Sequence, residues 1–207
     1  SVLTIAGGTQ VTKPNSPRAY SSQTSDIVIG YSGGGNKPTA ALAATPVTIS
    51  GVTITGGHSG KGGGIYGYNT LLAINNCVVT GNTAYYSGGG IYIDSSSSTL
   101  TVNNSTISNN TAGNTGGGVA TTDSAINIQQ SSITGNTAGR GGGIHAHNDN
   151  DNALTVTGST ISGNTSTGSY SYSNTGGGGV YTRHMTTSIT NSTIANNAAS
   201  TNGSGIY

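Results

Sequence analysis

The chain has 207 residues, a net charge of +1, only 5% charged residues and 36 glycines, which excludes an ordinary helical globule. It contains no Phe, Trp or Glu, so a compact core built on large aromatic side chains is also excluded. Clustered Lys and Arg are absent, so no nucleic acid is expected as a partner, and no apolar run approaches the roughly 20 residues that span a membrane.

Residues 1–46 form the irregular part of the sequence. Two short strand-like runs, at residues 2–5 and 26–29, are separated by a loop that contains Pro, Ser and Gln. We interpret this segment as irregular N-terminal coils or a cap. The chain would form a single β-helix domain over residues 1–207. Residues 1–46 would come first, and six regular repeats would follow over residues 47–207.

The regular repeats share one pattern of apolar residues. An apolar residue opens each unit except the last, a second follows two positions later, and a third follows seven positions later. The units open at Val47, Leu72, Leu100, Ile126, Leu154 and Thr187, at spacings of 25 to 33 residues. Alternation at period two predicts strands, and the small residue five positions after the opener should point inward.

Two corners and a glycine-led strand complete each predicted unit. Asn or Gly at the corners tolerates left-handed backbone geometry, as at Asn103-Asn104 and Gly163-Asn164. A glycine run then precedes a third strand, as at residues 141–144. Because parallel crossovers are overwhelmingly right-handed, the sequence predicts an all-β fold, a right-handed parallel β-helix (solenoid) with three strands per coil.

One asparagine recurs at the second corner of successive units. Stacked asparagines can hydrogen-bond amide to amide along the axis of a solenoid, which predicts an asparagine ladder. Its predicted members are Asn82, Asn110, Asn136, Asn164 and Asn197.

The pairing of Gly-Gly-x-Ile with Ile-x-x-Asn resembles the repeats of polymorphic outer-membrane proteins and related bacterial surface β-helices. Residues 88–91 with 79–82, and residues 141–144 with 133–136, carry this resemblance most clearly. It implies a pectin lyase-like parallel β-helix, a scaffold that hosts lyases, adhesins and structural fibres. The chain departs from the family pattern by using Ile or Val where the family often has Phe, and by lacking an autotransporter barrel.

Many right-handed β-helices cleave polysaccharides with acidic residues on one external face. Here the predicted outward column of the third strand contains Asp94, Thr122, His147 and Arg183. Asp94 and His147 lie two coils apart, roughly 10 Å, which is too far for a direct acid–base pair. The expectation is therefore a solvated surface with no catalytic residues, in a protein that is not an enzyme.

The run from His145 to Asp151 alternates potential metal ligands at period two, at His145, His147, Asp149 and Asp151. Asp-Asn runs are also ordinary turn formers, and the sequence identifies no convergent ligand from another coil. The expectation is therefore that the chain holds no metal and needs no cofactor, with these four residues as the candidate set.

A column of mostly aromatic side chains follows the aliphatic residue of the third strand. Cross-strand packing is the favoured interpretation, and binding of sugars is the alternative. The column contains Tyr66, Tyr92, His145, Tyr181 and Tyr207. Cys77 replaces a serine in an inward column, which predicts a buried and inert thiol.

Several asparagines lie in Asn-x-Ser/Thr sequences and are candidates for glycosylation, although chance matches are frequent in a chain so rich in Asn, Ser and Thr. They are Asn103, Asn104, Asn109, Asn164, Asn191 and Asn202.

The two ends of the chain carry strand-like sequence with no polar cap, at Val2, Leu3, Thr4 and Ile5 and at Gly205, Ile206 and Tyr207. Uncapped solenoids associate through their ends, which predicts a head-to-tail homopolymer. The expected function is a structural subunit of a filament or surface appendage, located extracellularly or at the cell surface. The alternatives are an adhesin that binds carbohydrate or other surface proteins, and a polysaccharide lyase or hydrolase.

Overall fold

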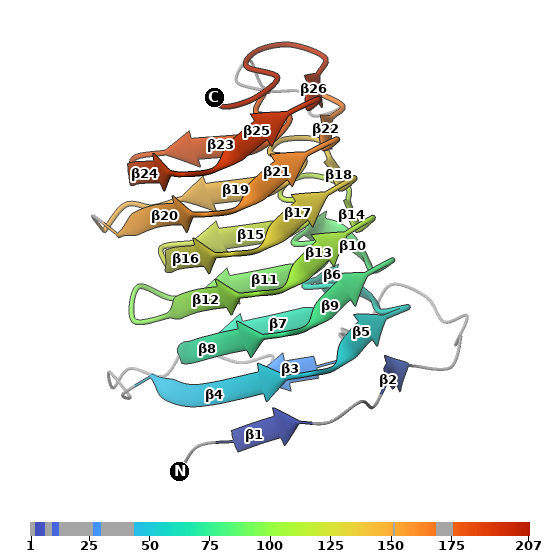
Figure 1. The fold of residues 1–207 in the computed structure, drawn as a ribbon, viewed down its shortest axis with the longest axis vertical. Coiled ribbons are helices and arrows are strands. Elements are labelled where there is room, and N and C mark those ends of the chain that lie inside the picture. The colour runs from blue at the N-terminus through green and yellow to red at the C-terminus, as the bar shows by residue number, and fades with distance from the viewer. Residues whose placement is uncertain (1–2, 7–9, 13–26, 30–43, 151, 169–175) are drawn as a thin grey trace.

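The computed structural model describes residues 3–6, 10–12, 27–29, 44–150, 152–168 and 176–207. These residues form strands, turns and bends, and no helix occurs among them. The chain winds as a solenoid in which successive coils contribute parallel strands to four sheets (Figure 1).

The four sheets are named A to D, and their strands are given in spatial order. Sheet A contains β1 (Leu3–Ala6), β4 (Thr45–Ser50), β8 (Thr70–Asn75), β12 (Thr99–Asn103), β16 (Ala125–Gln129), β20 (Ala153–Thr157) and β24 (Thr186–Thr190). Sheet B contains β2 (Gln10–Thr12), β5 (Thr53–Thr55), β9 (Val78–Thr80), β13 (Thr106–Ser108), β17 (Ser132–Thr134), β21 (Thr160–Ser162) and β25 (Thr193–Ala195). Sheet C contains β3 (Ile27–Ile29), β7 (Ile65–Tyr68), β11 (Ile91–Asp94), β15 (Val119–Thr122), β19 (Ile144–His147) and β23 (Val180–Arg183). Sheet D contains β6 (His58–Lys61), β10 (Thr83–Ser87), β14 (Thr111–Ala112), β18 (Thr137–Ala138), β22 (Thr165–Ser166) and β26 (Ala198–Ala199).

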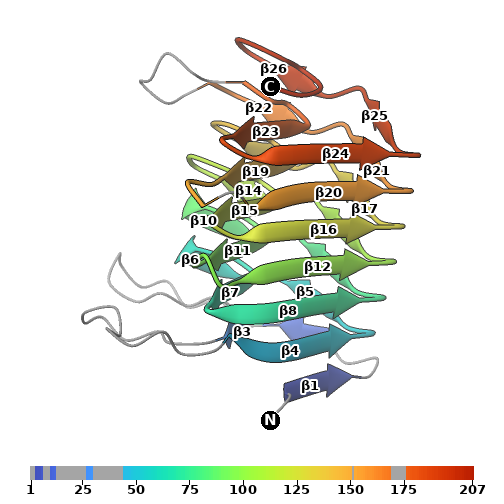
Figure 2. The ribbon, with the colours of Figure 1, turned by 90° about the vertical axis from the view of Figure 1, so that its left-hand side faces the viewer.

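The strands are paired in the register that the repeats predict. Leu100 pairs with Leu72 on one side and with Ile126 on the other, and Ile107 pairs with Val79 and Ile133 in the same way. Seen from the side, the strands of sheet A lie one above another along the whole solenoid (Figure 2). The predicted parallel β-helix is therefore confirmed.

The three predicted strands of each coil lie in sheets A, B and C, and sheet D adds a fourth, short strand. In the upper coils this strand has only two residues, as in β14 and β18. Two residues are too few to display an alternating pattern, so the predicted coil of three strands does not contain this one. The strand contributes one small inward side chain per coil, as at Ala84, Ala112 and Ala138.

Aliphatic side chains fill the interior in columns. Ile49, Ile74 and Ile128 from sheet A, and Ile54, Ile107 and Ile133 from sheet B, are fully buried. Burial of each such side chain stabilises the fold by about 1.5–3 kcal/mol.

A column of small residues also faces inward, as predicted, and it includes Cys77, Ser105 and Ser131. The Ser131 Oγ accepts a hydrogen bond from the Ser105 amide at 3.1 Å and donates to the Gln129 carbonyl at 2.6 Å. The Cys77 Sγ donates to the Asn75 carbonyl at 3.1 Å. These side chains therefore satisfy backbone groups that would be unpaired at the bend between sheets A and B.

Left-handed residues form the corners. Between sheets A and B the φ angle is 45° at Asn104 and 47° at Gln130, and between sheets B and D it is 54° at Asn109. Asn is among the few residues apart from glycine that adopt this geometry readily. The predicted corners are thus present where Asn, Gln or Gly occurs.

The five asparagines of the predicted ladder lie in one column at the corner between sheets B and D. The first four donate their Nδ2 to the Oδ1 of the next, at 3.0 Å for Asn82, Asn110 and Asn136 and at 2.9 Å for Asn164 to Asn197. Each Nδ2 also donates to a carbonyl of the preceding coil, as from Asn136 to Ile107 at 3.0 Å. Asn82, Asn110, Asn136 and Asn164 are fully buried.

Glycine is required opposite this ladder. A Cβ on Gly118 would lie 2.8 Å from the Gly143 carbonyl oxygen and 3.1 Å from the Asn136 Nδ2. A Cβ on Gly90 would likewise lie too close to the Gly118 carbonyl oxygen and the Asn110 Nδ2. The recurring association of a glycine run with Ile-x-x-Asn therefore has a steric cause, because the glycine carbonyl of the next coil and the buried amide together occupy the space that a side chain would need.

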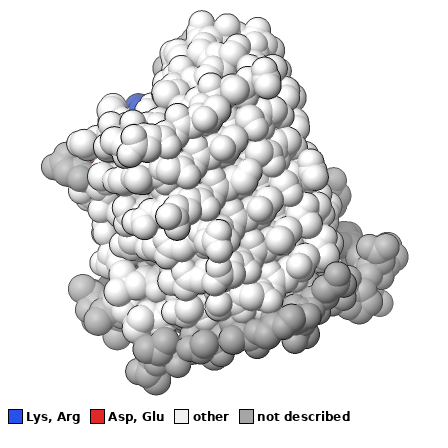
Figure 3. All heavy atoms as spheres, in the orientation of Figure 1, with Lys and Arg blue, Asp and Glu red and all other residues white. Residues whose placement is uncertain are grey.

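The lateral surface is nearly devoid of charge on the face shown in Figure 3, where white atoms dominate. Among the described residues, no helix is long and apolar enough to cross a membrane.

We predict that Asn136→Ala lowers the free energy of unfolding by about 3 kcal/mol, because it leaves the Asn110 amide and the Ile107 carbonyl buried without partners. The matched control is Asn127→Ala in β16, where the side chain faces outward and the change should stay within about 0.5 kcal/mol. Denaturant unfolding of both variants tests this. Equal stabilities for the two variants would show that the ladder contributes nothing specific.

Candidate functional site

The corner between sheets C and A brings together most of the charged and imidazole side chains of the upper coils. His147 ends β19, and its strand partner Arg183 ends β23 on the next coil. His184 follows Arg183 in the left-handed conformation, with a φ of 52°, and Asp123 occupies the same kind of position one coil below β19, with a φ of 56°.

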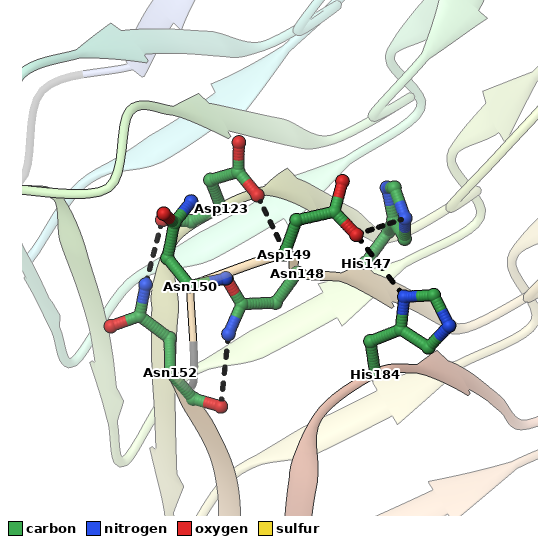
Figure 4. Close-up of polar contacts among 7 residues, drawn as sticks. All are labelled: Asp123, His147, Asn148, Asp149, Asn150, Asn152 and His184. Carbon is green, nitrogen blue, oxygen red and sulfur yellow. Dashed lines mark hydrogen bonds and ion pairs between the residues drawn. The ribbon is translucent and has the colours of Figure 1, made fainter.

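A hydrogen-bonded turn leads away from His147. The fully buried Asn148 accepts at Oδ1 from the Asn150 amide at 2.8 Å and donates from Nδ2 to the Asn152 carbonyl at 3.2 Å. The turn is fastened to the coil below, because the Asp149 amide donates to Asp123 Oδ1 at 2.9 Å and Asn152 Nδ2 donates to the Asp123 carbonyl at 2.8 Å (Figure 4).

Three metal-ligating side chains converge at this turn. The Asp149 Oδ1 lies 3.1 Å from His184 Nδ1 and 3.6 Å from His147 Nε2, so two coils contribute to one cluster (Figure 4). The ligand atoms of the three residues all lie within 4.8 Å of one another. We call His147, Asp149 and His184 the corner cluster.

The corner cluster lies at the surface. The side chains of His147, Asp149 and His184 are 27%, 64% and 60% exposed. The hydrogen bond with His184 lowers the pKa of the Asp149 carboxyl below its ordinary value, and the charges of His147, His184 and Arg183 act in the same direction. Asp149 is therefore a carboxylate at neutral pH and can accept a hydrogen bond or bind a cation.

The four metal-ligand candidates of the sequence analysis do not form one group. Only His147 and Asp149 join the corner cluster, and Asp151 lies outside the described residues. His145 is buried and stacked on Tyr181, with ring centroids 4.9 Å apart and planes at 4°. The pattern of alternating ligands was therefore wrong for His145, because the outward surface of β19 is covered at this position.

His184 was missed by the sequence analysis. It directly follows Arg183, which the predicted outward column had aligned with His147. The left-handed backbone at His184 turns its imidazole back toward the turn of the coil below. A comparison of corner residues across coils, instead of strand residues alone, would have placed His184 beside Asn148 and Asp123.

The outward column of Asp94, Thr122, His147 and Arg183 is in register in sheet C, as predicted. Thr122 lies between Asp94 and His147 in the column and accepts or donates a hydrogen bond with the Tyr92 hydroxyl at 3.1 Å. The structure therefore does not join Asp94 directly to His147.

The rings of the predicted aromatic column stack on one another, and those of Tyr92, His145 and Tyr181 are covered, whereas Tyr207 at its end is exposed. The rings of Tyr66 and Tyr92 stack at 5.8 Å, and those of Tyr181 and Tyr207 at 5.4 Å. Tyr92 and Tyr181 are only 3% exposed, which leaves their ring faces no room for a sugar. The Lys61 ammonium lies over the Tyr92 ring, 4.7 Å from its centroid, and covers this face of the ring.

Two exposed aromatic side chains lie elsewhere, on sheet D. Tyr85 and Tyr86 of β10 are 53% and 49% exposed, and their rings meet edge to face at 4.6 Å. They lie outside the repeat pattern, so the sequence analysis did not single them out. Gly60 on the coil below lies beside Tyr86, with a hypothetical Cβ 3.8 Å from its ring.

The glycosylation candidates differ in accessibility. Asn104, Asn109, Asn191 and Asn202 are exposed, and Asn103 is half-buried with its Nδ2 bonded to Asn75 Oδ1 at 2.9 Å. Asn164 is fully buried and belongs to the asparagine ladder, so glycosylation of Asn164 is incompatible with the folded coil.

The terminal residues that were expected to join subunits lie in strands or bridges of the outer coils. Leu3, Thr4 and Ile5 pair with Val47, Thr48 and Ile49, and Ile206 forms a bridge with Val180. Ile206 and Tyr207 are 46% and 40% exposed, whereas Gly205 is half-buried and Val2 lies outside the described residues.

His145 makes a pH-dependent contribution to stability. Burial, followed by the charges of Arg140 and His147, lowers the pKa of His145 from 6.5 to about 3. The unfolded chain therefore binds a proton at this residue as the pH falls below 6.5, whereas the folded chain does not. Stability is lost as the pH falls from 6.5 toward 3.

We predict that His145→Tyr, which places in this column the residue found at four of its other positions, removes about 3 kcal/mol of the stability difference between pH 7 and pH 4. Denaturant unfolding at both pH values measures it. The control is Asn127→Ala, which changes no titratable group and should keep the pH dependence of the unaltered chain. An unchanged pH dependence in His145→Tyr would contradict the assignment.

Comparison with known proteins identifies the fold family. No curated protein and no solved structure matches the chain. The family described as "Right handed beta helix region" matches residues 19–178, more than three quarters of the chain. The parallel strands, the ladder and this match agree, and the chain belongs to the right-handed β-helix family.

Proposed function

We propose that the chain is a structural subunit of an extracellular filament or surface appendage, in which β-helices stack end to end. The observation that supports this proposal most directly is that the contacts between successive coils are nearly the same along the solenoid. Successive coils are joined by parallel pairing in four sheets and by the same asparagine and serine hydrogen bonds.

The two sides of a coil are complementary. On one side the Asn136 Oδ1 accepts from the amide and the Nδ2 of Asn110, both at 3.0 Å. On the other side the amide and the Nδ2 of Asn136 donate to the Asn164 Oδ1, both at 3.0 Å. A joint of this kind between coils of separate molecules is heterologous, so it repeats without closing and produces a filament.

The expected partner is therefore a second copy of this chain. An extracellular or cell-surface location is supported by the surface of Ser, Thr, Asn and Gly with 5% charged residues. The family match supports a repeat scaffold of the kind found in surface and binding proteins, and the filament is our extension of it.

Residues on the last described coil allow the proposal to be tested. Ile189 and Ile194 are half-buried, whereas their partners Val156 and Ile161 are fully buried. A coil of another molecule stacked on them would cover both. We predict that Ile189→Lys shortens the filaments, because a stacked coil would have to bury the new charge.

Electron microscopy and light scattering over a range of concentrations measure filament length. The matched control is Ser188→Lys, in the same strand but on its outward face, which should leave filaments unchanged. Particles of a single size at every concentration of the unaltered chain would overturn the proposal.

Tyr85 and Tyr86 favour a second candidate function, an adhesin that binds carbohydrate. An exposed pair of aromatic rings offers apolar faces against which sugar rings pack. The test is a glycan array, which identifies the glycans that the unaltered chain binds. We predict that the double variant Tyr85→Ser and Tyr86→Ser binds these glycans at least about tenfold more weakly. If the double variant bound the same glycans as tightly as the unaltered chain, Tyr85 and Tyr86 would be excluded as the glycan-binding surface.

A further inference from the structure

We propose that the corner cluster of His147, Asp149 and His184 binds a divalent transition-metal ion, with Zn²⁺ as the best match. The site would connect two adjacent coils on the outside of the solenoid. It is independent of the filament proposal, because the cluster lies on the lateral surface.

The spacing of the ligand atoms fits such an ion. Tetrahedral Zn²⁺ at about 2.0–2.1 Å from imidazole and carboxylate ligands places any two ligand atoms about 3.3 Å apart. The distances from Asp149 Oδ1 are 3.1 Å to His184 Nδ1 and 3.6 Å to His147 Nε2, on either side of that value. The third pair, between the half-buried His147 and the exposed His184, lies within 4.8 Å, and an ion would bring the two imidazoles closer by side-chain rotation.

The donor set selects the class of metal. Two imidazoles and one carboxylate suit Zn²⁺, Co²⁺ or Ni²⁺, whereas Ca²⁺ and Mg²⁺ prefer sites made of oxygen ligands. With three protein ligands and 64% exposure at Asp149, solvent completes the coordination. This arrangement corresponds to a three-ligand site with one open position.

The backbone that carries the ligands is held before any metal arrives. The Asp149 amide donates to Asp123 Oδ1 at 2.9 Å, and the Asn148 turn holds the neighbouring backbone. His147 belongs to β19, and His184 lies at the left-handed corner after β23. Binding of an ion therefore requires rotation of side chains and little movement of the backbone.

The surrounding charges partly cancel. Asp123 brings a second carboxylate beside the turn, and Arg183 brings a positive charge that acts on Asp149. A bound divalent ion would thus meet one ligating carboxylate, one neighbouring carboxylate and one guanidinium. Because the site has three protein ligands and is open to solvent, we expect a lower affinity than that of a closed structural site with four ligands.

The test uses the full chain, freed of metal with a chelator, and Zn²⁺ alone in isothermal titration calorimetry. We expect one equivalent to bind, with Ca²⁺ at least about tenfold weaker. His184→Asn and Asp149→Asn should each weaken Zn²⁺ binding at least about tenfold. Asn is chosen at position 184 because it occupies the same left-handed corner at Asn69 and so preserves the fold.

The matched control is His58→Asn, which removes a histidine far along the sequence from the cluster and should leave Zn²⁺ affinity within about twofold. Co²⁺ gives a second readout, since a tetrahedral site with nitrogen ligands produces a visible absorption band that the two cluster variants should lose. No binding by the unaltered chain, or binding that all three variants share equally, would overturn the proposal.

Discussion

The contact between a buried asparagine and a glycine of the next sheet is the constraint on which the rest of the coil depends. The Asn136 amide fills the corner between sheets B and D, and a side chain on Gly118 would meet both this amide and the Gly143 carbonyl of the next coil. Both partners recur once per coil, so this corner has the same structure in successive coils although the coils differ in length.

The pattern of the sequence predicted this scaffold well, for a physical reason. Alternating aliphatic residues at fixed places, such as Leu100, Val102 and Ile107, can be buried together only in strands that stack in parallel. The ladder was equally predictable, since Asn110 and Asn136 recur at the same point of the unit. Periodic features are visible in a sequence because each copy supports the interpretation of the others.

The parts that were missed are those without a repeated signal. The two-residue strands of sheet D carry no alternation, so the predicted coil of three strands does not include them. The corner cluster combines residues from two coils whose lengths differ, and His184 reaches Asp149 only because its backbone turns in the left-handed sense. His145 was misjudged because covering of the outward face depends on the neighbouring Tyr181, which strand parity alone does not reveal.

The scaffold and the candidate binding surfaces therefore obey different rules. Interior positions are constrained by packing and by buried hydrogen bonds, whereas the corner between sheets C and A accepts turns of different length and composition. Ser95 to Ser98 and Asn148 to Asn152 occupy equivalent corners with different sequences. Specific chemistry in this molecule is found where a coil departs from its neighbours.

The asparagine ladder also has a mechanical consequence. The hydrogen bonds of all four sheets and of the ladder run along the axis of the solenoid, so a pull along that axis loads the joints between coils in series. In such a chain of joints the weakest one gives way first. At the coil of Gly57, glycine occupies the ladder position. Its amide donates to Asn82 Oδ1 at 2.9 Å and Asn82 Nδ2 donates to the Ile54 carbonyl at 3.1 Å, but the bond between two side-chain amides is missing. Under tension this joint would therefore depend less on the ladder and more on its strand pairing, which in sheet A extends over the six residues of β4 and β8.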